Sequence, residues 1–309
     1  MIECTGLRKT YGRTLAVDNL SFEVRPGVVT GFLGPNGAGK STTMRLMLDL
    51  DRGAGATRFD GKAFREFRHP MREVGALLEA KAFHPTRTAR NHLRMLAAAN
   101  GIPDSRVDHV LELVGLGSVA AKKPKGYSLG MAQRLGLAAA MLGDPKVIIL
   151  DEPANGLDPQ GISWLREMLR AFAAQGRTVF VSSHLLNEVQ VLADELVVIG
   201  RGRLIARGTI DDFVRASTHT AVIVRTPEAG RLAELLTGKG ATVERADDGA
   251  LLVTGFDQQD VGDLAFDSGV RLHELTTRIA TLEQAFLEAT AGDEEFETSI
   301  DAGTQEGLQ

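Results

Sequence analysis

The sequence predicts an α/β protein with a largely parallel sheet and an inserted helical block, followed by a small α+β unit. Up to about residue 216, short apolar runs of buried-strand character alternate with segments of helical spacing. Beyond that point, the runs approximate the order βαββαβα. The 309 residues are 43% hydrophobic and 24% charged, which indicates a normal packed core rather than disorder.

The first elements are expected to be strands leading into a glycine-rich loop. Ile2–Leu7 and Asn19–Val24 contain clustered or alternating apolar residues beside turn signals. Val28–Leu33 is a short apolar run bounded by glycines, and Ser41–Leu50 has helical spacing. These last two segments predict a βα unit whose loop lies at the carboxyl end of a strand.

A helical block is expected between about residues 80 and 142. Asn91–Asn100 is rich in Leu, Met and Ala, and Asp104–Val114 repeats valine and leucine at helical spacing. The remaining elements of the larger unit are expected to be the strands Val147–Leu150, Thr178–Ser182 and Leu196–Ile199 and the helices Ile162–Ala174 and Leu185–Leu192. We therefore expect a larger domain over residues 1–216.

A smaller α+β domain is expected over residues 217–291, and a disordered tail over 292–309. The predicted strands of this domain are Ala221–Val224 and Ala250–Val253, and its predicted helices are Leu232–Leu236, Val261–Phe266 and Thr281–Ala289. The amphipathic stretch Thr281–Leu287 is expected to pack on the larger domain or on a second subunit. Stabilising a dimer is the role we expect for this domain, and sensing a ligand is the alternative.

Charge is unevenly distributed along the chain. The formal net charge is −5, from 35 basic and 40 acidic residues, and six of the acidic residues lie in Asp293–Gln309, which contains no Lys or Arg. The rest of the chain, with 35 basic against 34 acidic residues, is close to neutral. Binding to DNA or RNA is therefore not expected as the main activity. The tail has the composition of a solvated acidic extension.

Cysteine usage and hydropathy place the protein in a reducing compartment. Cys4 is the only cysteine, so no intramolecular disulfide is possible. No secretory signal is apparent, and no apolar stretch approaches the roughly 20 residues that a membrane-spanning helix needs. We expect a cytoplasmic protein without a transmembrane segment, which reaches a membrane only from its surface or through a partner.

The glycine-rich loop has the pattern of a phosphate-binding loop. Residues 34–41 match G-x-x-x-x-G-K-[ST], with a predicted strand before them and a predicted helix after them. Backbone N–H groups of such a loop point at phosphate, while Lys40 reaches the β- and γ-phosphates and Ser41 ligates Mg²⁺. A chance turn would not explain this context. The expected ATP-binding residues are Gly34, Pro35, Asn36, Gly37, Ala38, Gly39, Lys40, Ser41 and Thr42.

Two acidic residues follow the apolar run Val147–Leu150. Asp151, at the carboxyl end of the predicted strand, is expected to hold Mg²⁺ directly or through water. Glu152 is expected to polarise an attacking water as a general base. Alone, such a pair is most often an ordinary strand end; beside a phosphate loop, the catalytic interpretation is favoured.

A third motif lies between these two. The stretch Tyr127–Arg134 reads YSLGMAQR, opens a predicted helix and resembles the signature sequence of ATP-binding cassette (ABC) ATPases. The resemblance covers about residues 1–215 and implies a P-loop ABC ATPase cassette with an inserted helical subdomain. It further implies that Tyr11 stacks on adenine, that 156–158 form the D-loop at a dimer interface, and that His184 is the switch histidine at the γ-phosphate.

The resemblance also implies a shared active site. Ser128 and Gly130, at a helix N-terminus, would bind the γ-phosphate of an ATP molecule held by another subunit. ATP would then join two subunits and hydrolysis would release them. Because the chain has one cassette, the simplest active unit is a homodimer.

Two departures from the family pattern indicate which group of ABC ATPases the chain resembles most. Glu79 replaces the usual Gln in the loop after Val74–Leu78, where a carboxylate can still ligate Mg²⁺. Leu129 replaces the usual Gly of the signature. Both are similar to features of ABC-2-type exporter ATPases, with the bacitracin- and lantibiotic-resistance group nearest. Such ATPases work at the cytoplasmic face of the membrane with a separate permease, here for a drug, antibiotic peptide or lipid.

A mixed apolar and basic segment near Glu79 is a candidate contact for that permease, and a solvated helix face is the alternative. Its residues are Phe83, His84, Pro85, Arg87, Arg90, His92 and Arg94. Two other functions stay open, namely a soluble ABC ATPase acting on ribosomes or DNA and an importer ATPase. The single phosphate loop, the short Ser41–Ser128 interval and the two departures weigh against them.

Overall fold

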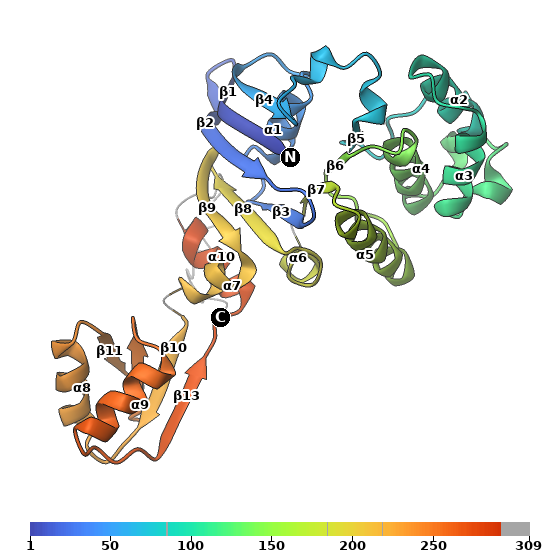
Figure 1. Ribbon diagram of the computed structural model, residues 1–309. Coiled ribbons are helices and arrows are strands. Elements are labelled where there is room, and N and C mark those ends of the chain that lie inside the picture. Colours follow the sequence, from blue (N-terminus) through green and yellow to red (C-terminus); the bar gives the residue numbers. More distant parts are fainter. Residues whose placement is uncertain (85, 184, 218, 292–309) are drawn as a thin grey trace, which may run out of the picture.

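The computed structural model describes residues 1–84, 86–183, 185–217 and 219–291. The predicted switch residue His184, Pro85 and the acidic tail lie outside the described residues. Figure 1 shows a larger body that carries both sheets of the N-terminal two-thirds and a smaller unit that extends from it.

A six-stranded sheet forms the centre of the larger body, with the order β5-β6-β7-β3-β8-β9. The strands are β5 (Val74–Leu77), β6 (Val147–Leu150), β7 (Thr178–Ser182), β3 (Val29–Leu33), β8 (Glu195–Gly200) and β9 (Arg203–Thr209). All neighbours pair in parallel except β8 and β9, which are antiparallel. Every residue of β3, β6, β7 and β8 is buried, as expected for a parallel sheet covered on both faces.

A second, antiparallel sheet with the order β2-β1-β4 packs against the first. It consists of β1 (Ile2–Tyr11), β2 (Thr14–Val24) and β4 (Ala54–Phe59), and helix α1 (Lys40–Met47) contacts all three strands. Phe22 of β2 stacks on Phe32 and Phe180 of the main sheet, with ring centroids 5.8 and 5.6 Å apart. This aromatic cluster fixes the two sheets to each other around the loop that precedes α1.

Helices beyond the β5 edge form the predicted helical block (Figure 1). They are α2 (Ala89–Ala99), α3 (Ser105–Leu113) and α4 (Leu129–Met141), and α5 (Pro159–Ala174) packs with them in one apolar core. Short 3₁₀ turns at Phe64–Glu66, Pro70–Arg72, Gly117–Val119 and Pro124–Gly126 connect the elements. The signature stretch therefore begins α4 as predicted.

The smaller unit is a four-stranded antiparallel sheet with the order β11-β12-β10-β13, covered by two helices. Its elements are β10 (Ala221–Arg225), α8 (Ala229–Gly238), β11 (Thr242–Arg245), β12 (Leu251–Thr254), α9 (Gln258–Asp267) and β13 (Glu274–Arg278). With α10 (Leu282–Thr290) after them, the order is the βαββαβα arrangement predicted from the sequence. The boundaries of the two domains stay predictions.

The chain returns from the smaller unit to the larger body. Helix α10 packs against α6 (Leu186–Leu192), α7 (Ile210–Arg215) and β9, next to the main sheet (Figure 1). The amphipathic stretch was expected to pack on the larger domain or on a second subunit, and in the structure it packs on the larger body of its own chain.

Candidate nucleotide-binding and catalytic site

The phosphate loop joins β3 to α1 and borders a cavity of about 300 Å³. Two of its glycines are required by backbone packing. A Cβ atom on Gly34 would lie 2.6 Å from the Ile199 carbonyl oxygen, and one on Gly39 would lie 2.4 Å from that of Ala16. Gly39 also has a φ of +98°, which disfavours any other residue. The cavity is lined by Ala16, Asn36, Gly37, Ala38, Gly39, Lys40, Ser41, Thr42, Asp151 and Glu152.

Lys40 is the buried cation of this cavity. Its side chain is only 8% exposed, and Nζ donates hydrogen bonds to the carbonyl oxygens of Gly34 (2.7 Å) and Pro35 (3.2 Å). Burial lowers the pKa of Lys40, and the charges of Glu152 and Asp151 oppose that effect. A buried ammonium that shares a cavity with backbone N–H groups is a fitting receptor for a polyphosphate.

Asp151 and Glu152 are brought to the same cavity by the end of β6. The Ser182 hydroxyl at the end of the neighbouring strand β7 donates to Asp151 Oδ1 and accepts from the Glu152 backbone N–H at 3.0 Å. From the other side, Gln133 Nε2 of α4 donates to the Glu152 carbonyl oxygen at 3.1 Å. Glu152 has a φ of +48°, a strained conformation that these two contacts hold in place.

The oxygen atoms around Lys40 fit a magnesium ion. Ser41 and Asp151 line one cavity, which suits a cation that takes one or two protein oxygens and fills its remaining positions with phosphate and water. Within the described part of the chain, no group of three or more His, Cys, Asp or Glu residues forms a dedicated metal cage. Glu79 is exposed and lines another cavity, and its metal role stays a prediction.

The signature residues lie apart from the phosphate cavity of their own chain. Ser128 is the N-cap of α4, where its hydroxyl accepts from the Met131 backbone N–H at 3.2 Å. A Cβ atom on Gly130 would lie 2.6 Å from the Gly156 carbonyl oxygen, so the helix start and the predicted D-loop are in close contact. Leu129 is 51% exposed. Neither Ser128 nor Gly130 lines the Lys40 cavity, which is the separation that a site shared between two subunits requires.

The D-loop is tied to α4 by charge. Asp158 caps α5 by accepting from the Gly161 backbone N–H at 2.9 Å, and it forms an ion pair with Arg134 at 3.7 Å. The Arg134 guanidinium also lies 5.5 Å from the centroid of the Trp164 ring. Sequence reasoning assigned no role to Gln133, Arg134 or Ser182. Gln133 and Arg134 belong to the signature stretch, and their place in that motif was the one feature of the sequence that could have pointed to them.

Tyr11, predicted to stack on adenine, lies at the end of β1 and is 46% exposed. Its hydroxyl donates to Asp51 Oδ2 at 2.5 Å, and Lys9 Nζ lies 4.6 Å from the ring centroid. The hydrogen bond to Asp51 raises the pKa of Tyr11. The ring is accessible, but it does not line the phosphate cavity; adenine stacking stays a prediction.

The segment predicted to contact a permease borders a second cavity of about 300 Å³, between the main sheet and the helical block. Two of its arginines are paired within the helical block, Arg90 with Asp108 and Arg94 with Asp104. Arg87 is exposed and has no carboxylate partner among the described residues. His92 lines the cavity and is buried, and its Nδ1 has no hydrogen-bond partner in the described part of the chain.

Comparison with known proteins agrees with this geometry. The ABC transporter family matches residues 17–155, and a domain of unknown function, DUF8746, matches residues 220–283. The lantibiotic transport ATP-binding protein SrtF of Streptococcus pyogenes is 36% identical over 212 residues, covering 68% of this chain and 92% of that protein. The bacitracin transport ATP-binding protein BcrA of Enterococcus faecalis is 40% identical over 217 residues, covering 69% and 70%.

A solved structure of an ATP-binding subunit of an ABC transporter superposes with a TM-score of 0.64 at 29% identity, covering 70% of this chain and 92% of that one. The chain belongs to the family of ABC transporter ATP-binding proteins. It is an ATPase of that family, with the P-loop ABC cassette fold predicted from its sequence. Among the described residues, no helix is both long enough and apolar enough to cross a bilayer.

Proposed function

We propose that this chain is the Mg²⁺-dependent ATPase subunit of an ABC-2-type exporter, acting at the cytoplasmic face of the membrane with a separate permease. The observation that carries the proposal is the single cavity that Lys40, Ser41, Asp151 and Glu152 share. It brings together groups suited to bind phosphate, to ligate magnesium and to act as a general base.

In the proposed reaction, the loop N–H groups and Lys40 bind the phosphates of ATP. Ser41 and Asp151 would hold Mg²⁺, which when bound neutralises phosphate charge. Glu152 takes the proton of the attacking water, and its orientation is fixed by the backbone hydrogen bonds from Gln133 and to Ser182.

A second copy of the chain completes the site in this proposal. Ser128 and Gly130 lie at the N-terminus of α4, away from the phosphate cavity of their own chain. The partial positive charge of that helix end attracts a γ-phosphate held by the second copy. ATP binding therefore joins the two copies, and hydrolysis removes the phosphate that joins them.

The permease is proposed to dock at the cavity beside Glu79. Apolar side chains line most of that cavity. Arg87 is exposed and has no carboxylate partner among the described residues, and burial together with the charge of Arg87 lowers the pKa of His92 in the cavity lining. This combination suits an amphipathic helix with an acidic residue. The names of the two relatives above favour an antibiotic peptide as cargo, with another drug or a lipid as further classes.

The test is recovery of tagged Glu152→Gln protein from its own cells in the presence of ATP. This variant should bind ATP and dimerise but hydrolyse it far more slowly, because the water loses its base. A small polytopic membrane protein should be recovered with it. Adding Arg87→Glu should reduce that recovery, whereas Arg245→Glu on the exposed strand β11 should not. Wild-type turnover in the Glu152 variant contradicts the catalytic assignment. Recovery of ribosomes or DNA without a membrane protein contradicts the exporter.

A further inference from the structure

The matched domain of unknown function connects to the catalytic body through α10. Residues Leu282 and Ala285 of α10 are 1% and 3% exposed, and Phe286 is partly buried beside them. A complete capping box at Thr281 and Gln284 fixes the start of the helix. α10 is thus a well-formed helix whose apolar face is inserted into the larger body.

The apolar cluster that receives α10 also contains residues from elements next to the nucleotide site. It contains Leu33, which directly precedes the phosphate loop, and Val189 of α6, which follows strand β7. Leu186 of α6 packs against the same cluster. The C-terminal helix and the elements that begin and flank the catalytic site therefore share one core.

Helix α6 is held mainly through Val189 and a hydrogen bond from Arg170 of α5 to the Val191 carbonyl oxygen. It has only seven residues, its N-cap position makes no side-chain hydrogen bond, and Val189 is its only buried residue. A helix this short is marginal by itself. Its position must therefore be set by packing.

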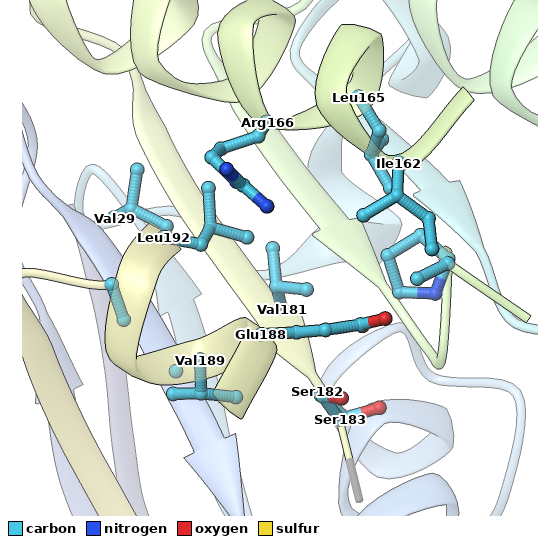
Figure 2. Close-up of a pocket in the computed structure, with 14 residues that line it drawn as sticks. Val29, Ile162, Leu165, Arg166, Val181, Ser182, Ser183, Glu188, Val189 and Leu192 are labelled. Carbon is cyan, nitrogen blue, oxygen red and sulfur yellow. The ribbon is translucent and has the colours of Figure 1, made fainter. Parts of the chain in front are cut away.

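The side of α6 that faces α5 is incompletely filled. An apolar cavity of about 30 Å³ lies there, with Val189 and Leu192 of α6 opposite Leu165 of α5 (Figure 2). Ser182 also lines this cavity, as does Pro153, which directly follows Glu152. This small cavity lies between α6 and the catalytic strand ends, whereas α10 contacts α6 within a separate apolar core.

We propose that α10 is a positioning strut for α6, and that through it the C-terminal unit controls the rate of ATP hydrolysis. The path is contiguous: α10 shares a core with Val189, Val189 lies against Gly31 of β3, β3 pairs with β7 as far as Ser182, and Ser182 bonds Asp151 and the Glu152 backbone. Movement of the C-terminal unit pulls on α10 through the short connection after β13, and so changes the support of the catalytic pair.

The experiment compares full-length Leu282→Ala and Phe286→Ala proteins with a matched control on the same helix, Leu287→Ala, whose side chain is 54% exposed. Three quantities are measured: kcat for ATP hydrolysis, ATP affinity, and hydrogen exchange of α6 amides. The two buried variants should lower kcat at least about threefold and change ATP affinity by less than about twofold. Amides of α6 should exchange faster, and the control should match wild type.

Rescue separates positioning from general stability. Leu282→Met conserves most of the volume and should restore kcat and α6 protection. Phe286→Leu is a milder substitution for use if the alanine variant folds poorly. Unchanged kcat in both buried variants overturns the proposal. So does a loss of activity accompanied by equally faster exchange along the whole chain, and so does a rise in kcat, which would make α10 a restraint rather than a support.

Discussion

The hydrogen bond from Gln133 to Glu152 predicts a rate defect without a binding defect. Gln133 is 2% exposed, and its Nε2 donates to the Glu152 carbonyl oxygen at 3.1 Å. Substitution by Met preserves most of the volume and removes the donor. The bond is partly buried, and a buried carbonyl that loses its partner costs at most about 1–3 kcal/mol. The left-handed backbone of Glu152, at φ +48°, is strained by a similar amount, about 1–3 kcal/mol, and loses its hydrogen bond from α4.

If the misplaced base raises the activation free energy of hydrolysis by this amount, kcat falls by roughly 5- to 150-fold. ATP affinity should stay within about twofold of wild type, because Lys40 and the phosphate loop keep their contacts. The assay is steady-state ATP hydrolysis together with equilibrium nucleotide binding. Gln259→Met, the same chemical change at an exposed position of α9, is the control. A Gln133→Met enzyme with normal kcat, or one whose ATP binding is clearly weakened, refutes the reasoning.

Two further predictions follow from close packing and burial. Gly130→Ala places a Cβ atom 2.6 Å from the Gly156 carbonyl oxygen. Adding this change to Glu152→Gln protein should therefore weaken its ATP-driven dimerisation in size-exclusion chromatography. The control Gly126→Ala, with open space around it, should dimerise normally, and equal dimerisation of both variants contradicts the close contact. Burial raises the pKa of Cys4 to about 12. The native thiol should therefore resist alkylation at about pH 8 and react only on unfolding. Because the unfolded thiol ionises from about pH 8.5, this group should lower stability as pH rises above that value; rapid native alkylation contradicts the assignment.

The sequence predicted those elements whose signal is local. The bounds of β6 and β7 were predicted to the residue because each is a continuous apolar run between turn signals. Strands β4 and β9 were missed, since both contain glycine and arginine and are largely exposed or half-buried. Such strands are specified by pairing with a partner strand rather than by their own pattern: β4 pairs with the distant β1, and β9 pairs with β8, which directly precedes it.

The residues of the candidate site likewise fall into those that the sequence could assign and those that it could not. The phosphate loop and the acidic pair are contiguous motifs and could be assigned from residue type and spacing. The residues that hold Glu152 could not, because Gln133 and Ser182 lie 19 and 30 positions away and meet it only when α4 and β7 are packed. Glu79 was assigned from the family pattern alone; it lines a cavity beside the helical block, and its metal role stays a prediction.

Helix α4 connects the two functions proposed for the signature stretch. Its N-terminus carries Ser128 and Gly130, the groups proposed to bind phosphate of the second copy. Within the next turn, Gln133 bonds the Glu152 backbone and Arg134 pairs with Asp158 of the D-loop. A rigid helix cannot shift at its first turn without moving those contacts. We infer that docking of the second copy's ATP at α4 adjusts Glu152 directly, which makes hydrolysis wait for dimer closure.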